Sequence, residues 1–414
     1  MLKRIPVDQL QLGMHLKEFC GAWIDHPFWR TEFVLKEPKD IELILASGVK
    51  EVMIDCSKGL DVPLGVMAGV GQEVSSVPVA PQPIVELLSP SLQHTNKVPA
   101  SQELERAALI CQRSKAAVVS MFQEARMGRA VDVGGALQLV EDISASIARN
   151  PGAIISLARL KTADDYTYMH SVAVCAMMVA LAKQMGLDDT QTRLCGMAGL
   201  LHDMGKVAMP TKVLNKPGKL TDAEFDVMRS HPAEGYKILT ASSAVDAVSL
   251  DVVLHHHEKI DGSGYPEGLN GEGISLYAKM AAVCDVYDAI TSNRPYKSGW
   301  DPAESLRRMA EWGGHFDPNV FQAFVKSMGI YPVGSLVRLK SGRIGVVIEQ
   351  SPKSLTMPII KAFFSTKSNM RIVPCVVDLS LPSTQEKIIN REDPAQWNFL
   401  DLNALWSGLS HVSH

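Results

Sequence analysis

The chain of 414 residues lacks any long hydrophobic run. Its most apolar stretch, residues 171–182, is followed at once by Lys183, and it is much shorter than the roughly 20 residues that a membrane span needs. The stretch therefore predicts a buried core helix, and we expect no membrane span. The amino terminus begins with a basic flank that no apolar segment follows, so we expect no secretory signal.

Paired cysteines and an excess of one charge are also missing. The seven cysteines are scattered and odd in number and include no Cys-x-x-Cys pair, which excludes a zinc ribbon and predicts reduced thiols in the cytoplasm. The 41 basic and 45 acidic residues give a net charge of −4, so no nucleic acid polymer is expected as a partner. With 46% hydrophobic and 21% charged residues the chain is an ordinary folded protein, and its length suggests two or three domains.

Four stretches of different composition predict a mainly α-helical protein with a small domain at each end. Residues 1–70 predict a small α/β module, and residues 71–100 form a Pro/Ser-rich linker. Residues 101–330 predict an all-helical domain, because nothing in this range alternates with period two over the length of a strand. Residues 331–414 predict a small β appendage followed by a tail.

Local signals place elements inside these domains. In the first module, residues 5–16 alternate like a strand until Gly13, residues 38–46 predict a short helix, and residues 49–55 predict a strand. The aromatic-rich segment 23–29 is expected to pack in a core or a turn. Near the other end, residues 334–348 predict a β-hairpin turning at Ser341-Gly342, residues 372–379 a further strand, and residues 397–406 a helix.

The helical domain has roughly eight or more expected helices, several with clear starting signals. Residues 221–224 form a capping box, in which the first and last side chains satisfy each other's backbone amides. Asp301-Pro302 and Asp317-Pro318 each place a capping residue before a proline in the first helical turn.

The residues with chemical potential are concentrated in this helical domain, where six of the twelve histidines lie between residues 170 and 257. Three motifs surround them: His202-Asp203-Met-Gly205-Lys206, then His256-His257-Glu-Lys-Ile-Asp261-Gly-Ser-Gly264-Tyr265-Pro266, then a segment that begins at Asp285 and includes Asp288, Arg294 and Lys297. Each motif alone is weak evidence, because a lone buried histidine is more often a hydrogen-bonded core residue than a ligand.

Their combination indicates a metal site. His202 and Asp203 follow the apolar run 197–201 at the end of a buried helix, where an imidazole and a carboxylate without a partner would be costly. A divalent cation would satisfy both groups, and mixed histidine and carboxylate ligands suit Fe, Mn or Zn. Gly205 is expected to end the helix and let Lys206 turn back over the site. His256 and His257 are expected at another helix end, since neighbouring helical residues point in different directions.

Taken together, these motifs resemble the HD-GYP family, bacterial phosphodiesterases of the HD superfamily that linearise the second messenger cyclic di-GMP. The patterns HDxGK and HHExxDGxGYP carry the resemblance, which covers roughly residues 145–330 and extends to residues 165–170, residues 231–236 and the DxxDAxTSxRPYK segment from Asp285. The first 70 residues are also similar to a small domain of unknown function that often precedes HD-GYP domains.

The resemblance implies two divalent metal ions, with Fe or Mn expected. One would be held by His170, His202, Asp203 and Asp285, and the second by His231, His256 and His257, with Asp203 bridging the two. His255 has no counterpart in the motif and is expected on the helix surface or behind the ligands. Some family members hold a third metal through a Glu at the position of Tyr166, which is no carboxylate, so two metals are expected, although Asp164 or Asp165 stands nearby.

Two metals would explain hydrolysis of a phosphodiester. A water shared by two cations has a lowered pKa, so hydroxide can attack phosphorus while the metals polarise the phosphate oxygens. Asp203 and Lys206 are the expected catalytic residues, Lys206 by stabilising charge on the transferring phosphate. Arg294 and Lys297 are expected to bind the substrate phosphates, unless they form a solvated helix end. Tyr265 is expected to face a guanine or a partner protein.

The leading hypothesis is therefore a cytoplasmic, metal-dependent phosphodiesterase that acts on cyclic di-GMP. The product is linear pGpG, or GMP if hydrolysis continues. Two alternatives stay open. One is hydrolysis of another cyclic dinucleotide such as cyclic GMP-AMP, since no residue in the sequence identifies the base. The other is a signalling module in which the loop that contains Gly264-Tyr265-Pro266, the GYP loop, docks protein partners and hydrolysis is secondary.

Overall fold

The computed structural model describes most of the chain. The described residues are 2–20, 33–35, 38, 41, 44–45, 51–60, 97–129, 133–160, 166–216, 218–242, 245–292, 299–351, 354–397 and 399–408. The aromatic segment 23–29, most of the 71–100 linker, Asp164, Asp165, Arg294 and Lys297 lie outside them. The chain divides into two compact units, Met1–Gln93 and His94–His414, and each is described by itself.

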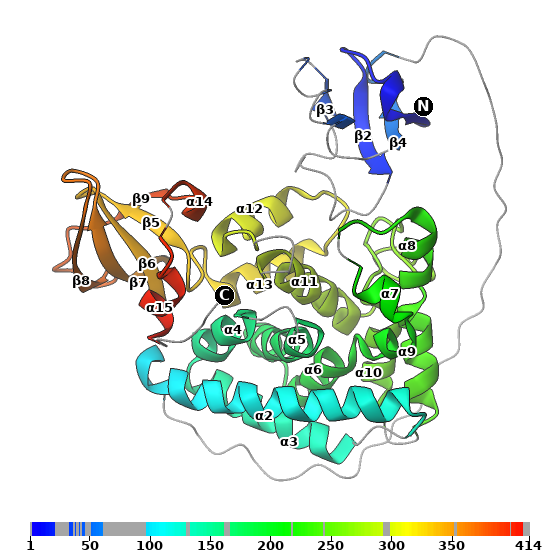
Figure 1. Cartoon of the computed structure of the whole chain (residues 1–414), viewed down its shortest axis with the longest axis horizontal. Coiled ribbons are helices and arrows are strands. Elements are labelled where there is room, and N and C mark those ends of the chain that lie inside the picture. The colour runs from blue at the N-terminus through cyan, green and yellow to red at the C-terminus, as the bar shows by residue number, and fades with distance from the viewer. Residues whose placement is uncertain are drawn as a thin grey trace. The chain divides into compact units, whose positions relative to one another are not determined.

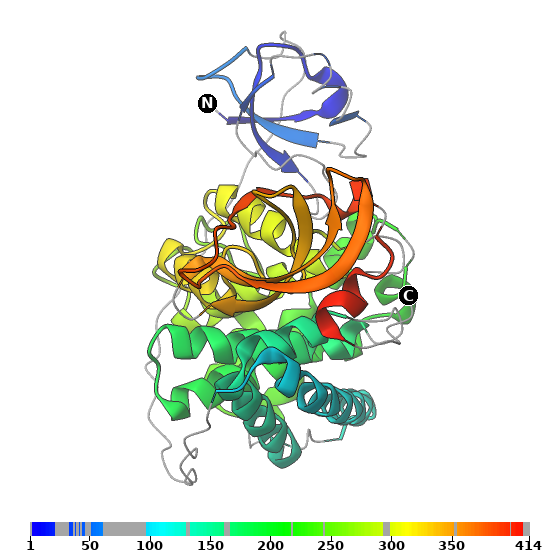
Figure 2. The same ribbon diagram turned by 90° about the vertical axis from the view of Figure 1, so that its left-hand side faces the viewer.

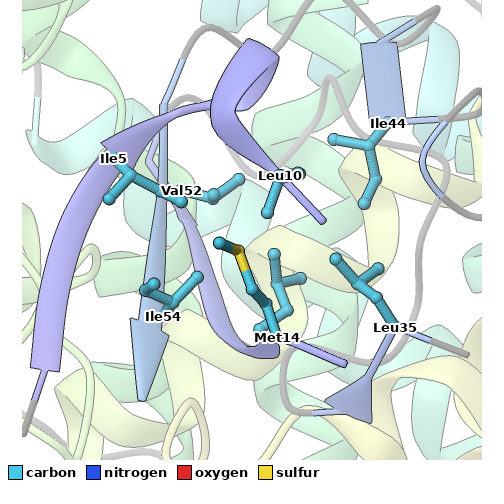
Figure 3. Close-up of a cluster of buried hydrophobic side chains, with 8 residues drawn as sticks. Ile5, Leu10, Met14, Leu35, Ile44, Val52 and Ile54 are labelled. Atoms are coloured by element: carbon cyan, nitrogen blue, oxygen red, sulfur yellow. The ribbon is translucent and has the colours of Figure 1, made fainter. Parts of the chain in front are cut away.

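The first unit contains a four-stranded antiparallel sheet in the order β1-β4-β2-β3. Its elements are β1 (Leu2–Pro6), the short 3-10 helix η1 (Val7–Gln9), β2 (His15–Cys20), β3 (Phe33–Val34) and β4 (Glu51–Asp55). Eight buried apolar side chains form its core, among them Ile5, Met14 and Ile54 (Figure 3). The alternation over residues 5–16 was expected to break at Gly13, where a turn lies with φ of +91°, but the chain already leaves the strand conformation earlier, at η1.

The second unit begins with a large helical region (Figure 1). Its helices are α2 (Ala100–Arg126), α3 (Val133–Arg149), α4 (Pro151–Arg159), α5 (Tyr166–Gln184), α6 (Asp189–Leu201), the 3-10 helix η2 (Met204–Ala208), α7 (Thr211–Leu214), α8 (Asp222–Met228), α9 (His231–Thr240), α10 (Ala247–His255), α11 (Leu276–Thr291), α12 (Pro302–Glu311) and α13 (Pro318–Met328). The capping box at residues 221–224 and the Asp-Pro helix starts at residues 301 and 317 are confirmed.

Helix α5 lies at the centre of this region. Every residue from 169 to 182 is buried, and the helix packs against α2, α3, α4, α6, α11 and α13. A helix that is apolar on all sides must be surrounded in this way, which confirms the predicted buried core helix. Among the described helices, none has the length and apolar character that crossing a bilayer requires.

The second unit ends in a curved five-stranded antiparallel sheet (Figure 2), in the order β8-β7-β6-β5-β9. Its strands are β5 (Leu336–Leu339), β6 (Arg343–Ser351), β7 (Ser354–Ser365), β8 (Met370–Asp378) and β9 (Ile388–Arg391). The predicted hairpin corresponds to β5 and β6, and the further strand to β8. The predicted helix over 397–406 is instead two short helices, α14 (Pro394–Trp397) and α15 (Leu402–Ser407). The expected fold class, mainly helical with small terminal domains, is confirmed.

Candidate metal centre

Five segments of the helical region bring seven predicted ligands together. His170 lies in α5, and His202 with Asp203 follows the end of α6. His231 begins α9, His256 and His257 follow α10, and Asp285 lies in α11. All are buried except His257, whose side chain is 18% exposed. Helix ends supply most of the ligands, so side chains that are neighbours in sequence reach a common centre from different directions.

Three of the histidines are oriented by the backbone. The Nδ1 atoms of His202 and His231 donate hydrogen bonds to the carbonyl oxygens of Gly199 and Met228, each at 2.8 Å. Nδ1 of His256 lies 3.0 Å from the carbonyl oxygens of both Val252 and Val253. Because a carbonyl can only accept, the proton is on Nδ1, and the Nε2 lone pair of each ring faces the centre. This is the tautomer that a metal-ligating histidine needs.

His170 is oriented by a carboxylate for which the sequence analysis gave no role. Its Nδ1 lies 2.6 Å from Oδ2 of Asp288, which is buried in α11 one turn after Asp285. Its Nε2 lies 2.9 Å from Oδ1 of Asp285. Burial lowers the pKa of His170, but its hydrogen bonds to the carboxylates of Asp285 and Asp288 outweigh this effect and raise the pKa overall. A carboxylate behind a histidine is a common arrangement at metal sites, and the i, i+3 spacing of the two Asp residues was the signal for it.

Asp203 stands between two sets of histidines. Its Oδ2 lies 3.4 Å from Nε2 of His202 and 3.5 Å from Nε2 of His170, while its Oδ1 lies 3.2 Å from Nε2 of His231. Oδ1 is buried and accepts no hydrogen bond from any described residue. Burial raises the pKa of Asp203, but nearby Lys206 and His202 hold it well below the usual range, so the group is an anion with an unsatisfied oxygen.

The ring nitrogens lie close enough together to share a cation. Nε2 of His231 and Nε2 of His256 are 3.3 Å apart, and both rings already carry their proton on Nδ1. Burial, followed by the nearby His257 and His202, lowers the pKa of His256 well below its usual range, so His256 does not relieve the contact by taking up a second proton. Imidazole and carboxylate donors in this arrangement fit Fe, Mn or Zn.

The donor atoms form three overlapping groups, each with its ligand atoms within 4.8 Å of one another. The groups are His170, His202 and Asp285; His231, His256 and His257; and His202, Asp203 and His256. The first two contain the histidines that the family resemblance assigns to separate metals, and the third joins them through Asp203. The individual assignments stay predictions.

Gly205 permits this convergence in a way that differs from the expected one. Helix α6 already ends at Leu201, and Gly205 lies inside η2. A Cβ atom there would lie 1.8 Å from the carbonyl oxygen of His231 and 2.5 Å from the amide nitrogen of Gly235. The glycine is therefore needed because η2 and the start of α9 touch through their backbones, which holds Asp203 beside His231.

His255 faces away from the centre. Its Nδ1 lies 2.8 Å from Oδ1 of Asp251, one turn earlier in α10, and its Nε2 lies 3.4 Å from Oε2 of Glu267. It belongs to none of the three donor groups. For Tyr166, only the backbone is described, at the start of α5.

A cation and an aromatic ring border the centre. Lys206, whose side chain is 21% exposed, donates a hydrogen bond from Nζ to Oδ2 of Asp203. The ring of Tyr265 stacks on His257, with centroids 4.7 Å apart and an angle of 26° between the planes. Burial raises the pKa of Tyr265, so the hydroxyl stays neutral.

The loop that carries Tyr265 is held by a buried carboxylate. Both oxygens of Glu258 accept hydrogen bonds from the backbone amides of residues 267–269, at 2.7 to 3.0 Å. Glu258 belongs to the HHExxDGxGYP motif, but its role was not predicted. It therefore supports the loop instead of providing a ligand.

Protein-family models match most of the chain. Residues 2–136 match a domain of unknown function (DUF3391), and residues 143–320 match an HD domain.

Curated relatives extend these matches. A cyclic di-GMP phosphodiesterase of Pseudomonas aeruginosa is 55% identical over 411 residues, which cover 99% of this chain and 97% of the relative. A cyclic di-GMP phosphodiesterase response regulator of Xanthomonas campestris is 42% identical over 179 residues, 41% of this chain and 47% of the relative. A 3'3'-cGAMP-specific phosphodiesterase of Vibrio cholerae is 37% identical over 163 residues, 39% of this chain and 31% of the relative. With its HD domain, its HDxGK and HHExxDGxGYP motifs and its nearly full-length relative, the chain belongs to the HD-GYP family.

Proposed function

We propose that this protein is a metal-dependent phosphodiesterase that hydrolyses cyclic di-GMP. The observation that carries the proposal is the buried Asp203, whose two oxygens face separate sets of histidine nitrogens. The substrate is supported by the relative from Pseudomonas aeruginosa, which is similar along nearly the whole chain.

The ligand set supports two divalent ions, and we infer Fe or Mn. His170, His202 and Asp285 would hold one, His231, His256 and His257 the other, and Asp203 would bridge them. Bound divalent ions at such a site supply an activated water and polarise the phosphate oxygens at neutral pH. The protein's own contribution is to fix the histidine tautomers and keep both carboxylates ionised, since the pKa values of Asp203 and Asp285 lie well below their usual range.

The reaction is hydrolysis without any redox change. The oxygen of water bonds to phosphorus, the bond from phosphorus to the ribose 3′-oxygen breaks, and the departing oxygen receives a proton. Lys206 stands beside Asp203, where its charge would stabilise the negative charge that develops on the phosphate. Arg294 and Lys297, known here only from sequence, would bind substrate phosphates. The first product is linear pGpG, and a second cycle on pGpG would give GMP.

A second candidate substrate is cyclic GMP-AMP. The similarity to a 3'3'-cGAMP-specific phosphodiesterase over 39% of this chain favours it. Both substrates have the same ring of two phosphodiesters, so the metal centre alone would serve either one.

The experiment that tests the proposal combines metal analysis of anaerobically purified protein with turnover of cyclic di-GMP and of 3'3'-cGAMP. We expect about two equivalents of Fe or Mn, with higher kcat/KM for cyclic di-GMP. Turnover that persists after complete chelation would contradict the metal-dependent mechanism. Protein that holds metal but cleaves neither dinucleotide would contradict the substrate.

We further infer a cytoplasmic location, which the scattered cysteines support.

The GYP loop remains a proposed docking surface for protein partners. Such docking would be consistent with a loop whose backbone is anchored at Glu258 and whose residues 266–268 are exposed.

A further inference from the structure

Arg229 extends the metal centre outward. It directly follows α8, and its guanidinium carbon lies 4.9 Å from the centroid of the Tyr265 ring and 6.0 Å from that of Phe225. Tyr265 in turn stacks on His257, with centroids 4.7 Å apart. The Arg229 guanidinium, the Tyr265 ring and the His257 ring therefore form a continuous stack, which runs from the exposed edge of the site to its centre.

The charge of Arg229 has no anionic partner in the described part of the chain. Several other arginines of this unit are paired with carboxylates, as Arg149 is with Glu103 and Arg371 is with Asp401. Among the residues that the structure describes, the guanidinium of Arg229 contacts only these two rings. Stacking on a ring holds a guanidinium by its face and leaves its edge free, and that edge matches the two oxygens of a phosphate.

The backbone fixes this cation relative to the ligands. The carbonyl oxygen of Met228, the residue before Arg229, accepts the hydrogen bond from Nδ1 of His231. The other described cation at the centre, Lys206, is hydrogen-bonded to Asp203. Because Asp203 lies among the predicted metal ligands, Lys206 would contact the phosphate that is cleaved there. A cyclic dinucleotide has a second phosphodiester, and it must lie away from the metals while the first is cleaved.

We propose that Arg229 binds the phosphodiester that is not being cleaved, while the ring of Tyr265 packs against one face of the guanidinium and holds it in place. The inference rests on the proposed function, because it requires a substrate with two phosphodiesters. Hydrogen bonds to charged groups contribute enough that their loss weakens binding by about 10- to 100-fold. The effect belongs to substrate recognition, so Arg229 is a specificity residue and the metals do not depend on it.

The test compares two substrates in the full-length, metal-loaded protein. Cyclic di-GMP has two phosphodiesters, whereas bis(p-nitrophenyl) phosphate has one and offers Arg229 nothing to bind. In Arg229→Ala we expect the ratio of kcat/KM for cyclic di-GMP to kcat/KM for the small diester to fall about 10- to 100-fold, mostly through KM. Arg229→Lys should recover part of the loss, because lysine keeps the charge but not the planar fork. Arg106→Ala, which removes an exposed arginine from α2, is the matched control and should leave the ratio unchanged.

Three outcomes would overturn the inference. A ratio within twofold of wild type in Arg229→Ala would show that the guanidinium does not contact the substrate. Parallel loss on both substrates with loss of metal would mean that Arg229 only supports Tyr265 and His257. A loss confined to cyclic di-GMP and absent with 3'3'-cGAMP would indicate contact with the second guanine, which adenine replaces in 3'3'-cGAMP, instead of contact with the shared phosphate. Failure of the proposed function looks different, because wild type would then cleave the small diester but not cyclic di-GMP.

Discussion

At the scale of single residues, Asp203 lies between both sets of predicted ligands. One oxygen faces His170 and His202, the other faces His231, and the second has no hydrogen bond from the described residues. A buried carboxylate with an unsatisfied oxygen is costly unless a cation completes it. The same side chain thus links both sets of ligands.

We therefore expect Asp203→Ala to abolish turnover and to reduce the content of both metals. Elemental analysis and a cyclic di-GMP hydrolysis assay on the same preparation measure the two effects. Asp189→Ala, an exposed position in the first turn of α6, is the control and should keep metal and activity. Full metal occupancy with normal turnover in Asp203→Ala would remove Asp203 from the site.

Lys206 differs from Asp203 because its predicted role concerns the reaction and not the metals. If it stabilises charge on the transferring phosphate, Lys206→Ala should keep its metal and its melting temperature while kcat falls about a hundred- to a thousandfold. Lys206→Arg should restore only part of the rate, since a planar fork does not replace a compact charge. Steady-state kinetics and metal analysis on the same preparation measure these effects. A near-wild-type kcat in Lys206→Ala would contradict the role in catalysis and would leave Lys206 only its hydrogen bond to Asp203.

The seven residues that the sequence predicted as ligands are brought together by the structure, but the residues that support them were not predicted. The ligands stand in short motifs, where spacing alone is informative. Asp288 makes a hydrogen bond with His170, which lies 118 positions earlier in the chain. Arg229 stacks on the ring of Tyr265, which lies in a different segment. Such roles depend on which helices become neighbours, and no local pattern in a single sequence contains that information.

At the scale of elements, the strands that the sequence missed have a physical explanation. The pairing of strand β7 with β6 shifts its register at three points, so a simple period-two alternation does not run along the strand. Strand β9 has only four residues, too few for an alternating pattern to stand out. By contrast, the hairpin of β5 and β6 was predictable because its turn and both alternating runs are contiguous.

The GYP loop is the element whose anchoring makes a separate prediction. Glu258 is buried and its carboxylate accepts three backbone hydrogen bonds from residues 267–269. Glu258→Gln keeps the shape but replaces one acceptor with a donor, so it should loosen the loop and misplace Tyr265. We expect faster amide hydrogen exchange over residues 262–269 and a raised KM for cyclic di-GMP, with the metals retained. Glu272→Gln, an exposed change nearby, should alter neither, and unchanged exchange in Glu258→Gln would contradict the anchor.

A charged contact joins the helical region to the carboxyl-terminal sheet. Glu304 of α12 accepts hydrogen bonds from Arg307 and Arg308 of the same helix and from Arg391 of β9. The bond from Arg307 is the largest cause that lowers the pKa of Glu304 to about 2, against the opposing effect of burial.

Because this pKa is lower in the folded protein, the carboxylate stabilises the fold above the ordinary value near 4.5, and the stabilisation is lost as the pH falls toward 2. Glu304→Gln should therefore lower the urea midpoint more at about pH 5 than at about pH 3. Glu311→Gln, which removes the more exposed partner of Arg307, serves for comparison and should have a smaller effect. An equal loss at both pH values would show that the ionised form of Glu304 is not what stabilises the contact.

At the scale of the whole molecule, the candidate site lies entirely in one of the two units. All seven predicted ligands fall within His94–His414, and the Met1–Gln93 unit has a core of its own. The start of the second unit is also held in place. The backbone amide of Val98 donates to the carbonyl of Arg149, and the side-chain amide of Asn150 donates to the carbonyl of Val98. A fragment that starts before Val98 therefore keeps these two hydrogen bonds, whereas a fragment that starts at Ser101 loses them.

These contacts predict how the chain can be divided. A fragment starting at His94 should fold, hold the same metal content and cleave cyclic di-GMP with kcat within about threefold of the full chain, because a domain with its own core folds alone. A fragment starting at Ser101 loses Val98 but keeps Glu103, whose carboxylate pairs with Arg149 at 2.7 Å. It should fold with a lower melting temperature and retain its metals. Thermal unfolding, metal analysis and turnover of both fragments test this directly. If the His94 fragment folds with its metals and yet is inactive, the amino-terminal unit must contribute to the site or to its regulation.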